Sequence, residues 1–275
     1  MEKNGFGSCG LPCFLCGSRE KCPGCGKTEG FTCPTFLCCS KKGLEHCSAC
    51  GEESCGIGIM NTAKAKGFSR YARKHGFSGL RERLLENEAA GAVYERASAF
   101  GDYDEPETEE DVERLLGCLK EPFEHKDTGD LTDGEIRLCC TRHMDYDLKR
   151  RFVPAYFFDI CLADGTRAGT CDLRIGHSRR LYLGGNIGYT VFPPFRGHHY
   201  ARKACRLLFR LAAAHGLEYV IVTCKPDNLP SRRTLEGLPG RLLETAVIPG
   251  ESDMYEKGYR EVCVFRFETS SFTEL

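Results

Sequence analysis

The sequence predicts an α+β protein: a small Cys-rich, metal-stapled domain with helices, followed by a mixed sheet of about seven strands flanked by helices. Two observations predict this order. Eleven of the 19 cysteines lie within the first 55 residues, which are also rich in glycine. From Glu135 onward, short apolar segments with the periodicity of strands follow one another, and one strand–helix–strand unit lies among them.

The composition sets the outer limits of function. A chain of 275 residues with 41% hydrophobic residues is long enough for two packed domains. Its net charge of −1 argues against binding nucleic acid or a membrane surface along the whole chain. No apolar run approaches the ~20 residues of a membrane span, and the first ten residues lack the plan of a signal peptide. We therefore expect a cytoplasmic protein with no membrane partner, whose oligomeric state the sequence leaves open.

We expect a Cys-rich, zinc-binding domain with a helical extension at 1–120, a linker at 121–134 and a second domain at 135–275. Within the extension, helical periodicity predicts one helix broken at Gly67, a second from about Gly79 and a third over 89–100. A short helix is expected over 109–119. The polar, Gly- and Pro-containing stretch that follows is typical of a linker.

The second domain is expected to hold most of the strands. Their expected ranges are 136–141, 156–162, 167–175, 187–191, 219–223, 243–247 and 262–267. A helix is expected over 202–215, where Gly216 follows at the position of a helix cap. A second helix is expected to begin near Asn228 and Pro230.

The stretch from Asn186 to Gly216 is the most informative part of the chain. It combines a short apolar strand, a Pro-Pro break, an Arg196-Gly197 turn and a helix. Backbone N–H groups at a helix N-terminus with arginine nearby form an anion site. The Gly-Lys-Ser/Thr of a Walker loop and the Gly-x-Gly-x-x-Gly of a dinucleotide fold are both absent from it.

The turn Arg196-Gly197-His198-His199-Tyr200-Ala201 resembles the acetyl-CoA motif of the GNAT N-acetyltransferases, Gln/Arg-x-x-Gly-x-Gly/Ala. His199 stands where that motif usually has its middle glycine. Downstream, Asn228-Leu229-Pro230-Ser231 resembles the Asn-x-x-Ser element of the branch that acetylates ribosomal-protein N-termini. The resemblance covers about 135–267 and implies a GNAT-type fold.

The resemblance also implies roles for individual residues. The N–H of Val191 would polarise the thioester carbonyl. The resemblance does not identify the base, because Asn186 stands where many relatives carry a carboxylate; Asp172 on the third strand is a candidate, acting through a water. Many relatives carry a tyrosine where this chain has Leu235, so Ser231 is the first candidate for the acid that protonates the thiolate. Tyr255 and Tyr259 are the next candidates for this acid. The residues expected to bind acetyl-CoA are Val191, Arg196, Gly197, His198, His199, Tyr200, Ala201, Asn228 and Ser231. Helix capping would explain Asn228 and Ser231 equally well.

Three Cys-x-x-Cys pairs, at Cys13, Cys22 and Cys47, are typical of metal knuckles in a reducing compartment. Eleven cysteines exceed one four-thiolate site, so we expect about two zinc ions, with the pairing of ligands undetermined. An iron–sulfur cluster is an alternative. The opening Cys9-Gly10-Leu11-Pro12-Cys13 resembles a bacterial Cys-rich family of unknown function. The expected ligands are Cys9, Cys13, Cys16, Cys22, Cys25, Cys33, Cys38, Cys47, Cys50 and Cys55.

These observations lead to one hypothesis and one rival. The hypothesis is an acyltransferase that moves an acetyl group from acetyl-CoA directly to a primary amine, on a small molecule or a protein N-terminus. The rival is an inactive GNAT-fold sensor or adaptor that holds CoA and acts through its zinc domain. The departures at His199 and Leu235 motivate the rival.

Overall fold

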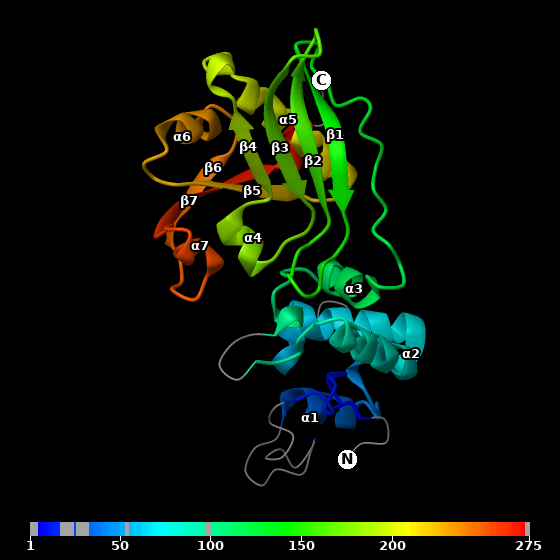
Figure 1. Cartoon of the computed structure of the whole chain (residues 1–275). Coiled ribbons are helices and arrows are strands. Elements are labelled where there is room, and N and C mark those ends of the chain that lie inside the picture. The colour runs from blue at the N-terminus through cyan, green and yellow to red at the C-terminus, as the bar shows by residue number, and fades with distance from the viewer. Residues whose placement is uncertain (1–4, 17–24, 26–32, 53–54, 97–100, 273–275) are drawn as a thin grey trace. The chain divides into compact units, whose positions relative to one another are not determined.

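The computed structural model describes residues 5–16, 25, 33–52, 55–96 and 101–272 (Figure 1). The chain divides into two compact units. The first comprises Met1–Pro122 together with Tyr146–Phe152, and the second comprises Phe123–Asp145 together with Val153–Leu275. Each unit has its own apolar core, so each is described separately.

The first unit is helical, with α1 (Pro34–Lys41), α2 (Ala63–Ala89) and α3 (Glu109–Gly117). Thr62 caps α2, because its hydroxyl accepts a hydrogen bond from the Ala65 N–H at 3.3 Å. Helices α2 and α3 pack against each other around buried side chains that include Phe68, Leu84 and Leu116. Burial of this apolar face is the main source of stability for two helices with modest intrinsic preference.

Two helix expectations in this unit are wrong. Gly67 does not break a helix: a Cβ there would lie 2.5 Å from Val112, so glycine allows α2 and α3 to approach closely. The break lies at Gly76, whose φ of 72° and ψ of 168° only glycine adopts readily. The third helix, expected over 89–100, is absent from its described part, because α2 ends at Ala89 and a turn with Gly91 at φ 111° follows.

The second unit contains all seven expected strands, with slightly different bounds. They are β1 (Ile136–Met144), β2 (Ala155–Leu162), β3 (Arg167–Arg174), β4 (Ile187–Val191), β5 (Tyr219–Cys224), β6 (Arg241–Val247) and β7 (Glu261–Glu268). Its helices are α4 (Arg179–Gly184), α5 (Tyr200–Ala214), α6 (Leu229–Glu236) and α7 (Asp253–Glu256). The strands do not form one mixed sheet. They form an antiparallel sheet of order β1-β2-β3-β4 and an antiparallel sheet of order β5-β7-β6.

Asn186 accounts for the division into two sheets. Its backbone N–H donates to the Ile221 carbonyl at 2.6 Å, and its side-chain oxygen accepts from the Ile221 N–H at 2.8 Å. Its amide nitrogen donates to the carbonyls of Arg174 and Gly176. Asn186 thus joins β5 to the start of β4, and no strand pairing continues between them in the described residues. The two strands separate beyond this point.

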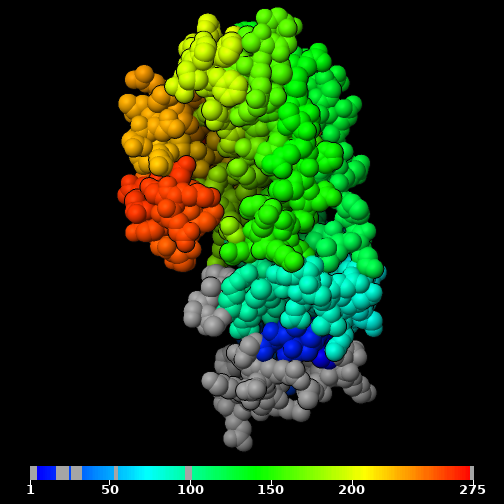
Figure 2. Space-filling view, in the orientation of Figure 1, coloured from blue at the N-terminus to red at the C-terminus, as the bar shows by residue number. Residues whose placement is uncertain are grey.

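The two faces of the β1–β4 sheet differ. One face packs against α5, which Figure 1 places behind the strands, and its alternate residues such as Phe158, Ile160 and Leu173 are buried. The other face carries half-buried polar and aromatic side chains and fronts the space-filling view in green (Figure 2). The strand period of two therefore gives this unit one apolar face and one polar face.

No helix in the described part of the chain combines the length and the apolar character needed to span a membrane.

Candidate functional site

The outer edge of β4 presents backbone groups that pair with no other strand in the described part of the chain. Phe192 donates to Ala168 on β3 and Arg174 on β3 donates to Asn186, so the even-numbered residues of β4 face β3. In an antiparallel ladder the alternate residues point the other way. Tyr189 and Val191 therefore direct their N–H groups to the edge beside β5, where the strands have separated. The sequence predicts a polarising N–H group at Val191 and not at Tyr189.

The turn before α5 concentrates further N–H groups. Gly197 has φ 88° and His199 has φ 60°, and no side chain caps the first turn of α5. The first N–H groups of a helix have no partner inside it, so those of Tyr200 and Ala201 are available to an anion. Arg196 extends from the same turn, exposed, and its Nε–H donates to the Val191 carbonyl at 3.2 Å.

The other two basic residues of this segment point elsewhere. Lys203 pairs with Glu135 and, at 3.6 Å, with Asp133. Arg202 lies against Gly237 and donates to the Arg233 carbonyl at 3.5 Å. His198 stacks on Tyr200, with ring centroids 5.4 Å apart, and the Tyr200 side chain is buried in the core. Arg196 is therefore the side chain of this turn best placed to meet a phosphate.

His199 has a structural explanation. Its backbone lies in the left-handed region, with φ 60° and ψ 19°. That conformation costs a non-glycine residue about 1 kcal/mol, and the motif that this turn resembles usually has glycine at this position. We expect His199→Gly to raise the free energy of unfolding by about 1 kcal/mol, measured by urea denaturation. His198→Gly, which replaces a neighbour of ordinary φ, is the control and should be neutral or destabilising. Equal effects of the two changes would contradict the strain at His199.

Ser231 and Tyr189 meet across the space between β4 and α6. The Tyr189 hydroxyl lies 2.8 Å from Ser231 Oγ. Burial raises the pKa of Tyr189, so its hydroxyl keeps its proton at neutral pH. Ser231 also contacts the Cys224 thiol, whose pKa burial raises to about 11. Asn228 caps α6, since its side chain accepts from the Ser231 N–H at 3.3 Å, as the capping interpretation expects.

Asp172 lies on the polar face, level with Gly188 of β4. A Cβ on Gly188 would lie 2.6 Å from Asp172 Oδ1, so glycine leaves room for this carboxylate over the strand. Burial raises the pKa of Asp172, and the charge of Arg174, 2.8 Å away, and the Gly188 N–H oppose that shift. A carboxylate with a raised pKa suits proton transfer near neutral pH.

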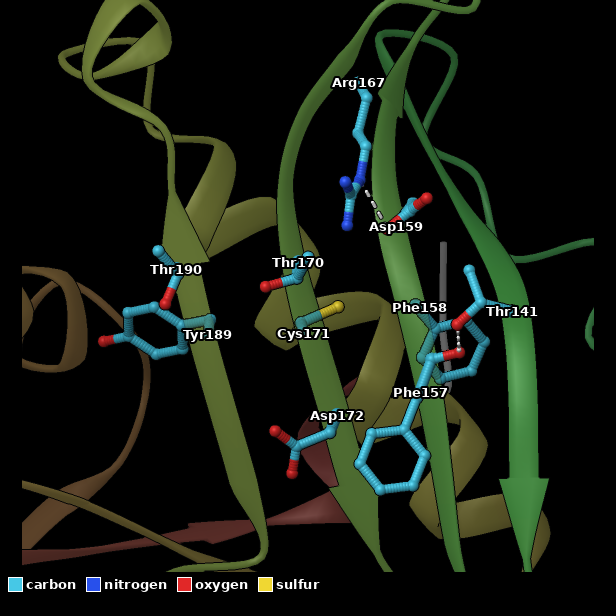
Figure 3. Close-up of a pocket in the computed structure, with 10 residues that line it drawn as sticks. All are labelled: Thr141, Phe157, Phe158, Asp159, Arg167, Thr170, Cys171, Asp172, Tyr189 and Thr190. Atoms are coloured by element: carbon cyan, nitrogen blue, oxygen red, sulfur yellow. Dashed lines mark hydrogen bonds and ion pairs between the residues drawn. The ribbon is translucent and has the colours of Figure 1, made fainter.

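A cavity of about 190 Å³ opens on the same face (Figure 3). Its side chains come from neighbouring rows of the sheet: Phe157, Asp159, Arg167, Thr170, Asp172 and Thr190. In Figure 3 Asp172 points toward β4, and Arg167 reaches Asp159, with Nε and Oδ1 2.6 Å apart. The cavity therefore adjoins Thr190, next to Val191 on β4.

Tyr255 and Tyr259, the other acid candidates, are not gathered at this site in the described contacts. Tyr259 packs in an apolar cluster with Val262 and Ile248, separate from the core that Tyr189 joins. Tyr255 is exposed beneath the guanidinium of Arg260. Leu235 is buried in the core that Tyr189 adjoins. Tyr189, which the sequence offers only as core or pocket wall, is the tyrosine whose hydroxyl lies beside Ser231.

The cysteines of the first unit form two groups. A Cβ on Gly7 would lie 3.3–3.5 Å from the sulfur atoms of Cys25, Cys9 and Cys13. Burial raises the pKa of Cys47 to about 12, and the neighbouring Cys39, Cys55 and Cys50 add to that shift. No disulfide joins the described cysteines. Among the described residues no group of three or more His, Cys, Asp or Glu is arranged to hold a metal ion, and Cys22 lies outside them.

One family model matches part of the chain. Residues 105–238 match the model of the acetyltransferase (GNAT) domain. No curated protein matches the sequence.

Solved structures also align with part of the chain. A GNAT-family acetyltransferase from Bacillus anthracis is 17% identical over 42% of this chain and 66% of its own, with a TM-score of 0.33. RimJ from Mycobacterium smegmatis, in complex with CoA-disulfide, is 21% identical over 44% of this chain and 56% of its own, with a TM-score of 0.35. Spermidine N-acetyltransferase from Vibrio cholerae, in complex with CoA and spermine, is 13% identical over 43% of this chain and 68% of its own, with a TM-score of 0.33. The chain thus spans about two thirds or less of these chains' length.

The segment that matches the acetyltransferase (GNAT) domain model includes the α5 turn, β4 and the cavity-lining strands.

Proposed function

We propose that the protein is an acetyl-CoA-dependent N-acetyltransferase that acetylates a primary amine by direct transfer. One observation carries the proposal: Val191 directs its N–H to a strand edge that pairs with no other strand among the described residues, between the start of α5 and the Tyr189–Ser231 pair. The α5 turn and Arg196 would bind the pyrophosphate, and the strand edge would hold the pantetheine arm and thioester. Acetyl-CoA needs an anion site for its pyrophosphate at one end and a polarising N–H for its thioester at the other.

In the proposed reaction the amine nitrogen attacks the thioester carbon, so an N–C bond forms and the C–S bond breaks. The Val191 N–H, with Tyr189 N–H beside it on the strand edge, stabilises the oxyanion. Asp172 accepts the amine proton, directly or through one water. Ser231 supplies a proton to the departing thiolate and takes one from Tyr189. Asp172 then releases the amine proton to solvent and Tyr189 takes one from solvent, which restores both groups.

The proposal is tested by calorimetry with acetyl-CoA and by acetyl transfer to a panel of primary amines. We expect saturable binding and release of one CoA per amide formed. Absence of binding at millimolar acetyl-CoA would contradict the proposal. Binding without turnover on any amine would favour the alternative, a CoA-holding sensor or adaptor that acts through the Cys-rich segment.

The hydroxyl pair gives a separate prediction. Ser231→Ala and Tyr189→Phe each remove one hydroxyl from the pair and should each lower kcat, by about 10²-fold for Ser231→Ala, with little change in acetyl-CoA binding. Because the two groups act in series, the double variant should lose no more than the larger single loss. Thr166→Val, which removes an exposed hydroxyl in the turn between β2 and β3, is the control. Losses that multiply in the double variant would contradict the relay.

We also propose that the Cys-rich segment binds zinc. The Cys-x-x-Cys pairs of the sequence support the proposal, and so do the sulfurs of Cys9, Cys13 and Cys25 around Gly7, while the described residues alone form no complete ligand group. Thiolates are preferred zinc ligands. Metal analysis should give about two zinc ions per chain, and chelation should lower the melting temperature, because zinc supplements a small core. Cys13→Ser should lose one ion and the control Cys140→Ser none. Iron with visible colour would contradict zinc.

A further inference from the structure

Three histidines of the second unit gather beside the Tyr156 ring, outside the proposed transfer site. His143 on β1 is the register partner of Tyr156, His215 follows the last residue of α5, and His125 belongs to the segment before β1. Figure 1 draws that segment as a coil beside β1. The ring centroids of His125 and His143 lie 4.0 Å apart, and those of His125 and Tyr156 lie 5.0 Å apart. No step of the proposed transfer uses these groups.

Residues 123–126, here called the strap, are held against the sheet and α5 through these rings. Phe123 stacks on His215, with ring centroids 5.1 Å apart. The Lys126 N–H donates to the Tyr156 hydroxyl at 2.6 Å, and that hydroxyl lies 2.7 Å from His215 Nε2. The hydroxyl satisfies both partners when its own proton goes to Nε2, which accepts only when it is unprotonated. The docked strap therefore fits a neutral His215.

His125 is the buried imidazole of the strap. Its side chain is 10% exposed, and neither ring nitrogen makes a hydrogen bond within the described part of the chain. An Asp145 carboxylate oxygen lies 3.5 Å from its Nε2. Burial and the neighbouring His143 lower the pKa of His125, and Asp145 opposes that shift. Protonation of both rings would place two cations side by side with one carboxylate to offset them.

The titratable groups around the strap come from the strap itself, from β1 and the residues after it, from β2 and from α5. They are Glu124, Lys126, Cys140, His143, Asp145, Tyr156 and His215. Glu124 and Lys126 are exposed and pair with each other at 3.8 Å. Protonation of the imidazoles therefore gives this cluster a net positive charge.

We propose that the strap is a pH-sensitive device, which is docked while the imidazoles of His125, His143 and His215 are neutral and is released by acid. A histidine whose pKa is lowered in the folded state stabilises docking above the ordinary value of about 6.5. That contribution is lost as the pH falls from there through the lowered pKa. The residues that follow stay on β1, because Leu131 is buried and its carbonyl accepts from the Leu138 N–H at 2.9 Å.

Hydrogen exchange of the whole protein, measured by mass spectrometry, tests the release. Protection factors, which correct for the intrinsic exchange rate at each pH, are compared between about pH 7.5 and about pH 5.5. We expect the protection of the strap amides to fall about 10-fold per pH unit for each proton taken up, while the amides of β5 and β7 keep theirs. An equal fall in all three segments would show general acid unfolding and overturn the proposal, as would strap protection that does not change with pH.

Three variants identify the trigger. His125→Phe keeps a ring that cannot be charged, so its strap should be better protected than that of the wild type at about pH 5.5. The matched control is His177→Phe, which replaces a histidine that packs on Tyr219 and should keep the wild-type pH dependence. Tyr156→Phe removes the acceptor for the Lys126 N–H, so strap protection should fall at both pH values.

A pH dependence of His125→Phe equal to that of the wild type would overturn the assignment of His125. Should a substitution unfold the protein, the wild-type exchange profile still decides, because local release and general unfolding differ in whether β5 and β7 keep their protection.

Discussion

Asp172→Asn is expected to lower kcat at least about 100-fold while leaving the Kd for acetyl-CoA unchanged, because it removes the proposed base without touching the anion turn. Asparagine retains the shape over Gly188 and cannot accept the amine proton. The deficit should shrink as the pH rises toward the pKa of the amine, since an amine that arrives neutral and sheds its proton to solvent needs the base less. The pH profile of kcat/KM distinguishes this from a structural defect, which would lower activity at every pH.

The same substitution should stabilise the protein. Burial holds the pKa of Asp172 above its unfolded value, so its contribution to stability is present below the unfolded pKa and is lost as the pH rises through the folded pKa. Asparagine stays neutral and avoids that loss, so Asp172→Asn should melt higher than the wild type at neutral pH and converge with it in acid.

Asp164 in the β2–β3 turn offers a matched control of opposite sign. Hydrogen bonds from Thr166 lower its pKa, so its stability contribution is present above the unfolded pKa and is lost as the pH falls through the folded pKa. Asp164→Asn should therefore not raise the melting temperature at neutral pH, and it should not change kcat. A melting temperature of Asp172→Asn below that of the wild type at neutral pH would contradict the assignment of a burial-destabilised carboxylate.

Local pattern made the strands and the anion turn predictable. The strand over 187–191 and the helix that Gly216 ends are marked by short-range periodicity and by turn residues, which act within a few positions of the chain. The separation of β4 from β5 had no such signal. It depends on Asn186 bonding Ile221, and only the folded chain brings those residues together.

The same limit applies to the catalytic candidates. Ser231 was predictable from an Asn-x-x-Ser element, but its hydroxyl partner Tyr189 lies 42 positions away. Asp172 was predictable as a polar residue on a strand, yet its place over Gly188 requires the β3–β4 register. A glycine in the middle of a short strand was the one available signal, because such a residue marks a close approach. His199 became explicable only once its backbone conformation was known.

Arg196→Ala is expected to weaken acetyl-CoA binding by about 10- to 100-fold, the loss typical of a charge-assisted hydrogen bond to phosphate. The side chain is exposed and its Nε–H donates to Val191, so the terminal nitrogens are left to meet a phosphate from the same turn. Arg196→Lys keeps the charge and loses the planar fork, so its affinity should fall between those of wild type and Arg196→Ala. Raising the ionic strength should narrow these differences.

Arg196 also supports the Val191 carbonyl, so its loss could act through the strand rather than through the phosphate. Acetyl-pantetheine separates the two effects, because it carries the thioester and lacks the pyrophosphate. If Arg196 binds phosphate, the alanine variant should use acetyl-pantetheine as well as the wild type does and should be impaired only with acetyl-CoA. An equal loss with both donors would show that Arg196 acts by holding β4, and the anion would then depend on the α5 N-terminus alone.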